Sequence, residues 1–428
     1  MMMKRLKKFS RQFGPGIVTG AADDDPSGIA TYSQTGAQFG YGQLWTAVFM
    51  FPLLAAVQEA CARIGAVCGK GIAGVIKEHY SPKILYMTVF LVLIANTINI
   101  GADIGAMAAA ANLILPINFV ILTLLFTVVI LVLQIFVSYR AYANYLKWLC
   151  LSLIAYPITV FMVEEPWLQI LKATFIPHFE LNFQFLFIIT GVLGTTITPY
   201  LFFWQASMVV EDERERSSKR KNTKPKISWK LIQRLRIDNF VGMLFSEICT
   251  WSIIVVTATV LHTHGITDIK TSADAARALE PFVQTFPHAG YLAKVIFSIG
   301  IIGLGLLAVP VLAGSSAYAL SEALNWKEGL NLKLKNAHGF YGIITISTLL
   351  GLIINFIGID PIKALVYAAV LNGIIAVPLI FLIALIARNK KIMGVYKSKM
   401  LSSTLVWMTF AGMLVTVIAM LYTFFSSL

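Results

Sequence analysis

Residues 14–42 read GPGIVTGAADDDPSGIATYSQTGAQFGYG, an apolar stretch with three consecutive acids in its middle. An ionisable side chain inside a membrane helix is costly and by default marks a pathway or a binding site. Pro26 has no backbone N–H and disfavours helix at Asp25, while Gly28 adds flexibility. We therefore predict a membrane helix that unwinds at Asp25-Pro26-Ser27-Gly28, where free carbonyl oxygens lie beside a carboxylate.

The composition places this stretch in an integral membrane protein. Apolar residues make up 57% of the chain, charged residues 13%, and the mean hydropathy is +0.76. Soluble domains carry about a quarter charged residues. Many apolar runs reach the length of about 20 residues that crosses a bilayer as a helix, and none shows the short alternating segments of a barrel. An all-α membrane protein is the fold class that follows.

Eleven membrane helices are predicted, and Lys and Arg set their orientation. If the N-terminal segment 1–13 is cytoplasmic, most basic residues share its side, including those of the charged loop 211–237. This predicts a multi-pass protein of the cell (plasma or inner) membrane with its C-terminus outside. Of the 34 Lys and Arg residues, the outer side keeps only Lys172, Lys270, Arg277, Lys294 and Lys363. The spans lie near 14–39, 43–67, 84–112, 118–138, 142–163, 184–210, 238–261, 290–322, 340–358, 361–387 and 402–425.

A second interrupted helix occurs five spans after the first. Residues 185–210 read FLFIITGVLGTTITPYLFFWQASMVV, with Gly and Thr clustered before Pro199. Discontinuous helices at matching positions of two repeats are the best sequence indication of a transporter's central site. We therefore predict an inverted repeat, with spans 1–5 in residues 14–163 and spans 6–10 in residues 184–387. The segment 402–425 forms the eleventh span.

The two breaks offer oxygen ligands suited to a hard cation. The Asp25 carboxylate, the Thr195 carbonyl, the Thr198 hydroxyl and carbonyls near Gly28 are all available. Mg²⁺, Ca²⁺ and Mn²⁺ prefer such oxygens, whereas sulfur and imidazole select softer metals. A divalent metal ion is thus expected as substrate, with no cofactor, no nucleic acid and no obligatory protein partner beyond the lipid bilayer.

Other polar positions near the breaks are candidates for the ion's pathway or the surroundings of the site. Gln34 could face a water-filled outer path or bond to a neighbouring helix. Asp103 in the third span should face water or a polar partner, because a buried unpaired carboxylate is costly. Glu59 and Arg63 are spaced to pair on one helix face. The full set of pathway candidates is Asp23, Asp24, Ser27, Gln34, Asn99, Asp103 and Tyr200.

Three motifs in order resemble the NRAMP family of divalent-metal transporters. Asp25-Pro26-Ser27-Gly28 stands where that family has D-P-G-N. Residues 62–73, ARIGAVCGKGIA, are similar to its A-R-L-G-x-x-T-G-x-x-L-A, and residues 195–200, TTITPY, stand where it has A-x-x-M-P-H. The resemblance covers nearly the whole chain. It implies a LeuT-type fold of two inverted five-helix repeats, with broken helices 1 and 6, that works by alternating access.

The departures from the family pattern concern the ligands and the proton route. Gly28 replaces the amide ligand, and Thr198 replaces the methionine that favours Mn²⁺ and Fe²⁺. Tyr200 replaces a histidine, and Asn99 and Ala102 align with two acids of the third helix. Asp103 lies one position further, about 100° around the helix axis, and is a doubtful substitute.

This pattern resembles the NRAMP-related magnesium transporters. It implies Mg²⁺ uptake, with Mn²⁺ also carried, without proton coupling. A proton-coupled Mn²⁺/Fe²⁺ symporter with altered ligands remains an alternative, as does a transporter of an organic cation or amino acid on the same fold. An enzyme is not expected, because the sequence has no spaced His/Glu metal motif and no nucleophile elbow.

Overall fold

The computed structural model describes residues 19–20, 22–137, 153–219 and 227–426. Within these ranges the regular structure is entirely helical, in agreement with the predicted all-α class. The long helices are α3 (Pro26–Phe39), α4 (Trp45–Cys68), α6 (Pro82–Asn112), α7 (Phe119–Phe136), α11 (Phe183–Thr196), α12 (Pro199–Lys219), α13 (Trp229–Val260), α16 (Ala289–Leu324), α17 (His338–Ile354), α18 (Pro361–Arg388) and α20 (Met400–Ser426). Shorter helices are α5 (Ile72–His79), α9 (Ala155–Val160), α10 (Trp167–Phe175), η2 (His262–His264), α14 (Ser272–Arg277), α15 (Glu280–Val283), η3 (Leu334–Asn336), α19 (Lys390–Met393) and η4 (Gly394–Tyr396).

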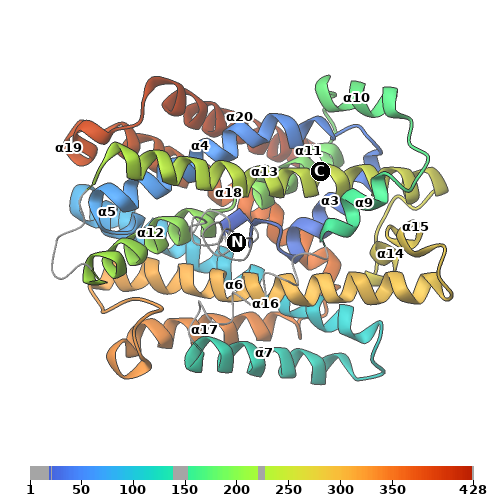
Figure 1. Ribbon diagram of the computed structural model, residues 1–428, viewed down its shortest axis with the longest axis horizontal. Helices are drawn as coiled ribbons and strands as arrows, with labels where there is room; N and C mark the ends of the chain where they lie inside the picture. The colour runs from blue at the N-terminus through green and yellow to red at the C-terminus, as the bar shows by residue number, and fades with distance from the viewer. Residues whose placement is uncertain (1–18, 21, 138–152, 220–226, 427–428) are drawn as a thin grey trace, which may run out of the picture.

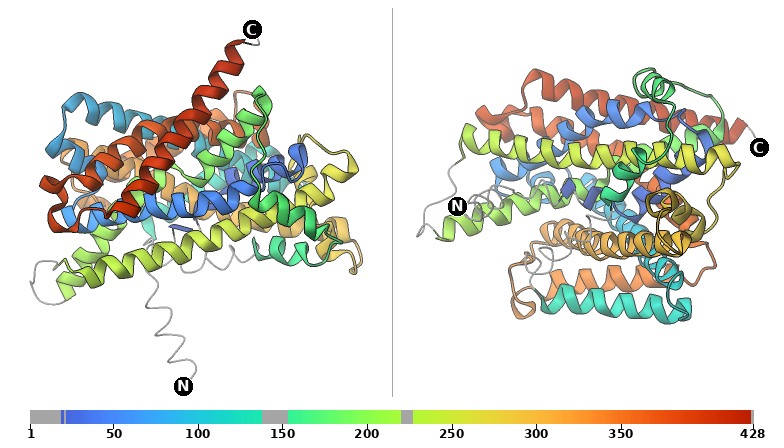
Figure 2. Two further views of the ribbon diagram at one scale, coloured as in Figure 1. Left: turned by 90° about the horizontal axis from the view of Figure 1, so that it is seen from above. Right: turned by 45° about the vertical axis from the view of Figure 1, so that its right-hand side comes forward.

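Most long helices run roughly along one direction of the bundle. Figure 1 shows α13 and α16 crossing its full length, with α7 and α17 along one edge and α20 towards the other. α16 packs against α6, and α18 packs against α11, α6 and α20. The far end of α20 extends beyond the other helices, as the left view of Figure 2 shows.

Eight segments in the described part are long and apolar enough to cross a membrane. They are α4, α6, α7, α11 with α12, α13, α16, α18 and α20, and the shorter α17 is also apolar. These nine agree with nine of the eleven predicted spans. The first span begins outside the described residues and continues as α3, and much of the fifth span, 142–163, also lies outside them. The segment 1–13, the two-repeat division and the orientation stay predictions.

Polar caps decide where several helices begin. The side chains of Asp25, Ser81 and Asn182 each accept a hydrogen bond from a backbone N–H in the first turn of the helix that follows. Such caps satisfy donors that have no partner inside the helix. The seventh span was predicted to start at residue 238, but α13 starts at Trp229 because Ser228 caps it there. Its first two turns carry polar residues, which hydropathy does not count as membrane helix.

At one end of the bundle, acidic side chains hold neighbouring helices together. Arg63 pairs with Glu59, which confirms the pairing predicted on α4. The Glu322 carboxylate of α16 accepts hydrogen bonds from the backbone N–H groups of Gly71 and Gly74, at 2.9 Å for Gly74. A Cβ at Gly71 would lie 2.5 Å from Glu322 Oε1, so the carboxylate would have to shift if a larger residue stood there. The N-terminus of α5 is thereby fixed to the end of α16.

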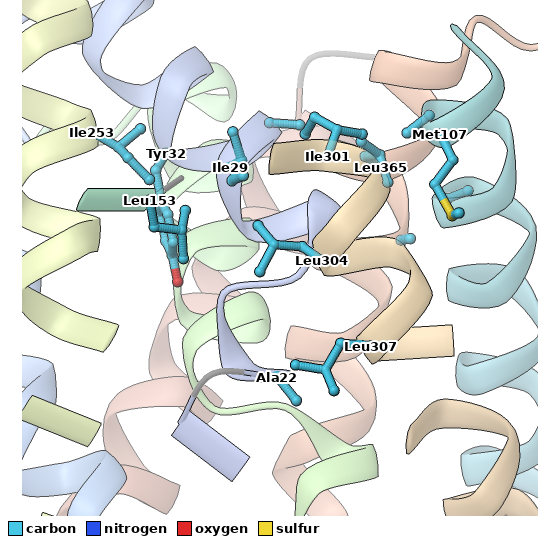
Figure 3. Packing of buried hydrophobic residues seen from close by; sticks show 14 of the residues in the cluster. Ala22, Ile29, Tyr32, Met107, Leu153, Ile253, Ile301, Leu304, Leu307 and Leu365 are labelled. Carbon is cyan, nitrogen blue, oxygen red and sulfur yellow. The ribbon is translucent and has the colours of Figure 1, made fainter. Parts of the chain in front are cut away.

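The broken first helix lies inside the apolar core. Figure 3 shows Ala22, Ile29 and Tyr32, from both sides of the break, among buried residues that include Leu304 of α16. Residues 19–20 and 22–23 are helical, the chain is non-helical at Asp24 and Asp25, and α3 begins at Pro26. The predicted unwinding is confirmed at Asp25, but it covers Asp24 and Asp25 only, because Pro26, Ser27 and Gly28 already form the first turn of α3.

Candidate functional site

Asp25 organises the first break. Its Oδ1 accepts hydrogen bonds from Ser27 Oγ at 2.5 Å and from the Gly28 N–H at 2.9 Å, so it caps α3. Its Oδ2 lies 3.1 Å from the hydroxyl of Tyr200, on the second broken helix. The carboxylate is completely buried. A carboxylate offers about four lone-pair positions, so it can bind a cation while keeping these bonds.

The two prolines leave matching carbonyl oxygens without their helical donors. Pro26 supplies no N–H to the carbonyl of Ala22, and Pro199 supplies none to the carbonyl of Thr195, four residues earlier in each case. The Tyr200 hydroxyl donates to the Ala22 oxygen at 2.9 Å. The Thr195 oxygen is the second carbonyl that loses its helical donor in this way.

The two breaks contact each other through hydroxyl groups. Ser27 Oγ lies 3.2 Å from Thr195 Oγ1, and Tyr32 OH lies 3.0 Å from Thr196 Oγ1. Thr198 Oγ1 is buried without a hydrogen-bond partner. A Cβ at Gly28 would lie 3.3 Å from Thr195 Oγ1, so a side chain there would enter the space between the breaks. The structure thus brings Asp25, Ser27, Gly28, Thr195 and Tyr200 together, and their role in binding an ion stays a prediction.

Two of the predicted pathway residues lie on α6. Asn99 and Asn372 of α18 exchange amide hydrogen bonds at 2.8 and 3.1 Å. Asp103 is completely buried, and neither of its carboxylate oxygens has a hydrogen-bond partner. The expectation that Asp103 faces water or a polar partner was therefore wrong. The charge of Asp25 acts on Asp103, and the charge of Asp103 acts on Tyr200, so Asp103 belongs to the same buried region.

Asp23 and Asp24 share one hydroxyl on α13. Ser246 Oγ lies 2.9 Å from Asp23 Oδ2 and 2.9 Å from Asp24 Oδ1. The other oxygen of each carboxylate has no hydrogen-bond partner, and both residues are completely buried. Glu247, beside Ser246, is buried with both carboxylate oxygens unpartnered.

Gln34 lies on the opposite side of the break, at the wall of a cavity. Its Nε2 donates to the carbonyl of Thr267 at 3.2 Å, and its Oε1 accepts from the N–H of Ile269 at 2.9 Å. The cavity has a volume of about 290 Å³, and Asp268, Lys363 and Tyr367 also line it. Gln34 thus borders a cavity, and its role in an outer path stays a prediction; its bonds go to the non-helical segment around Ile269 and not to a neighbouring helix.

Sequence reasoning missed four residues that complete this region: Tyr32, Ser246, Glu247 and Asn372. An ionisable residue in the middle of an apolar segment could have drawn attention to Glu247. Their partners lie 164 to 273 positions away in the chain, so no local pattern pairs them with the breaks.

The donor set of the paired breaks consists of oxygen atoms. No group of three or more His, Cys, Asp and Glu side chains forms a metal cage among the residues the structure describes. The paired breaks instead combine one carboxylate with hydroxyls and backbone carbonyls. Few protein ligands of this kind suit an ion that keeps part of its water shell.

Fold and site together define a polytopic helical membrane protein of the LeuT-type fold, with two broken helices facing each other. The chain belongs to the Nramp (natural resistance-associated macrophage protein-like) family, whose model matches residues 16–423. Among curated relatives, it is 27% identical to the divalent metal cation transporter MntH of Klebsiella pneumoniae, over 89% of this chain and 86% of that protein. It is 24% identical to MntH of Caldanaerobacter subterraneus, over 91% of this chain and 87% of that protein.

Solved structures agree with this fold at low sequence identity. The manganese transporter of Eremococcus coleocola superposes with a TM-score of 0.76 at 16% identity, covering 95% of this chain and 85% of that one. Mhp1, a nucleobase-cation-symport-1 family transporter, superposes with a TM-score of 0.57 at 13% identity, covering 96% and 92%. The second likeness extends the shared architecture beyond metal transporters.

Proposed function

We propose that this protein carries divalent metal cations across the cell membrane by alternating access. Membership of the Nramp family and similarity to the MntH divalent metal cation transporters support this class. Mg²⁺ is the preferred ion in this proposal, Mn²⁺ is also carried, and protons are not coupled. The relatives are transporters, which favours transport over an enzymatic activity.

The preference for Mg²⁺ is inferred from the hydroxyl of Thr198. It is buried and unpartnered between Thr195 and Tyr200, both of which contact the first break. A hydroxyl is a hard ligand, and the position would otherwise offer a soft sulfur atom if methionine stood there. Gly28 contributes no side chain and leaves room between the breaks. This arrangement favours Mg²⁺ with some of its water retained.

The absence of proton coupling is supported by the groups on α6 and α12. Asn99 bonds reciprocally to Asn372, and an amide cannot relay a proton. Tyr200, whose phenol has an ordinary pKa of about 10, donates to Ala22 and titrates little at neutral pH. An inside-negative potential supplies about 2.3 kcal/mol per charge per 100 mV, and about twice that for a divalent ion. Uptake down this gradient requires no second ion.

The alternative function is a proton-coupled Mn²⁺/Fe²⁺ symporter. One observation favours it: Asp103 is buried and unpartnered within electrostatic range of Asp25. A carboxylate in such a place can exchange a proton when the charge of Asp25 changes. The two functions differ in what crosses the membrane with the metal.

Purified protein in proteoliposomes separates the two functions. Entry of Mg²⁺ and Mn²⁺ is measured with an internal metal dye, and internal pH with a second dye, under a potassium-diffusion potential. We expect metal entry that follows the potential without acidification of the lumen. Acidification in proportion to metal entry would establish the symporter instead, and no entry of either metal would refute both.

Asp25→Asn tests the site itself. The substitution keeps the shape of the side chain but removes its charge, so Mg²⁺ and Mn²⁺ transport should fall to the level of empty liposomes. Asp268→Asn, which changes an acid at the wall of the outer cavity, is the matched control and should transport normally. Wild-type rates in Asp25→Asn would remove the basis for placing the ion between the breaks.

A further inference from the structure

Two basic segments of the chain meet at the end of the bundle that carries α19. Residues 227–237 lead into α13, and residues 388–401 join α18 to α20. Figure 1 shows α19 and the first turns of α13 at the same end of the bundle. Neither segment contains Asp or Glu. Their basic residues are Lys230, Arg234 and Arg236 in the first, and Arg388, Lys390, Lys391, Lys397 and Lys399 in the second.

Aromatic contacts and a hydrogen bond hold the two segments together. The ring centroids of Trp229 and Tyr396 lie 5.1 Å apart. The ammonium of Lys399 lies 5.6 Å from the centroid of the Trp229 ring, within the range of a cation–π contact. The hydroxyl of Tyr396 donates to the carbonyl of Ile227 at 3.1 Å. These contacts fix the segments relative to each other, so their positive charges add on one surface.

α4 supports the second segment from the interior. Arg63 is buried, and its Nη1 donates to the carbonyls of Tyr396 at 3.2 Å and Lys397 at 3.3 Å. The charge of Arg63 is balanced by Glu59, which also lies 3.5 Å from Arg236. The backbone that carries the lysines is therefore held in place, and the acid behind it is already shared by two arginines.

The lysines of this surface have no acidic side chain as a partner in the described structure. Lys230, Lys397 and Lys399 are exposed, and none of them forms an ion pair with a described residue. The residues outside the described ranges include no Asp or Glu, so none of their side chains can supply a negative charge. An anion from the surroundings can thus bind these ammonium groups without displacing a partner.

Apolar side chains beside the lysines indicate the kind of anion. Trp229 is 43% exposed and Met400 is 87% exposed, and Val395 and Leu401 are also exposed. α13 begins at Trp229, α18 ends at Arg388 and α20 begins at Met400, and all three helices are long and apolar enough to cross a membrane. The ends of such helices lie near the lipid headgroups, where Trp is enriched and Lys reaches towards the interface. A lipid, with a charged headgroup and apolar chains, therefore matches this surface better than a soluble anion.

We propose that Trp229, Lys230, Lys397, Lys399 and Met400 bind the headgroup of an anionic phospholipid. The ammonium groups contact the phosphate oxygens, and Trp229 and Met400 lie against the glycerol and the upper part of an acyl chain. A lipid bound in this way joins the start of α13 to the start of α20. The inference is independent of the transported ion, because none of these residues belongs to the candidate ion site.

Lipid binding to the purified full chain in detergent tests the proposal. Phosphatidylglycerol and phosphatidylcholine are added separately, and native mass spectrometry measures the lipid that each chain retains. We expect preferential retention of phosphatidylglycerol, and slower hydrogen exchange of residues 394–401 when it binds. The double variant Lys397→Gln/Lys399→Gln should bind phosphatidylglycerol on the order of tenfold more weakly, because two ammonium contacts are lost. Melting temperatures without added lipid confirm that the variant is folded.

Lys333→Gln/Lys335→Gln is the matched control. These two lysines are also exposed and two positions apart, but they lie at η3, outside the proposed surface, and their loss should leave phosphatidylglycerol binding unchanged. Equal weakening in both double variants, or equal retention of the two lipids by the wild type, would overturn the proposal. Inorganic phosphate that slows exchange at residues 394–401 as much as phosphatidylglycerol does would overturn it too, since the surface would then bind a free anion. Proteoliposome flux tests the proposed transport separately from all of these outcomes.

Discussion

The hydroxyl of Tyr200 lies 2.9 Å from the carbonyl oxygen of Ala22 and 3.1 Å from Oδ2 of Asp25. One phenol of the second broken helix therefore contacts both the backbone and the carboxylate of the first. The Ala22 oxygen is available because Pro26 cannot donate to it. The link between the two breaks is thus a direct consequence of the proline that creates the first one.

Tyr200→Phe should destabilise the protein and slow transport. The change leaves the Ala22 oxygen and one Asp25 oxygen without this donor, at a cost of about 1–3 kcal/mol. Thermal unfolding and Mg²⁺ flux both report on the change. Tyr156→Phe is the matched control, because the hydroxyl of Tyr156 is buried and makes no hydrogen bond to any residue that the structure describes. Equal melting temperatures for the two variants would argue against the link.

Thr198→Met should shift ion preference towards Mn²⁺. A thioether replaces a hydroxyl that has no other partner, so a soft ligand is gained without breaking a hydrogen bond. We expect the ratio of Mn²⁺ to Mg²⁺ transport to rise about tenfold, which corresponds to ~1.4 kcal/mol. Thr198→Leu supplies similar bulk without sulfur and should not raise the ratio. A rise in both variants would mean that size alone decides the preference.

Gln34→Ala should loosen the segment around Ile269. Gln34 makes two hydrogen bonds to this segment, each contributing about 0.5–1.5 kcal/mol. Hydrogen exchange of the Ile269 amide should accelerate by roughly tenfold as its acceptor is lost. Gln38→Ala is the control, since Gln38 bonds to Gln34 and Gln184 and not to the segment. Unchanged exchange in Gln34→Ala would show that other contacts hold the segment.

Glu328 should make stability depend on pH. Burial and, next, the charge of Glu322 raise the pKa of Glu328 from 4.5 to about 8 in the folded protein. The folded chain therefore binds more protons than the unfolded chain between these values, and stability falls as pH rises from 4.5 to 8. Melting temperatures across this range should decrease in the wild type.

Glu328→Gln isolates this contribution. The variant cannot ionise, so we expect a smaller decrease of the melting temperature and a higher value than wild type at pH 9. Glu280→Gln, at an exposed acid of α15, should follow the wild type. If Glu328→Gln and wild type lose stability in parallel, ionisation of another group governs the pH dependence.

The glycines of the family motif on α4 and α5 were predicted from the sequence, but their physical role is visible only in the structure. The glycines of Cys68-Gly69-Lys70-Gly71 were matched to a family pattern without a physical reason. In the structure the Gly71 N–H donates to Glu322, and a Cβ at Gly71 would crowd that carboxylate and Ser207 Oγ. The partner lies 251 positions away, so only the fold supplies the reason.

The sequence by itself determined the class, the spans and the two breaks. Hydropathy, charge asymmetry and the positions of Pro26 and Pro199 are local properties, and backbone hydrogen bonding in lipid leaves helices as the outcome. It also predicted Asp25 and Thr198 as oxygen ligands, because ligand chemistry follows from residue type.

Only the tertiary structure decided which polar groups share the buried interior. The pairing of Tyr200 with Ala22, of Asn99 with Asn372, and of Ser246 with Asp23 joins helices far apart in the chain. The same packing buried Asp103 without a partner, against expectation. Helix faces and close approaches are set by the whole bundle at once, so the cost or use of a buried charge cannot be known from its own segment.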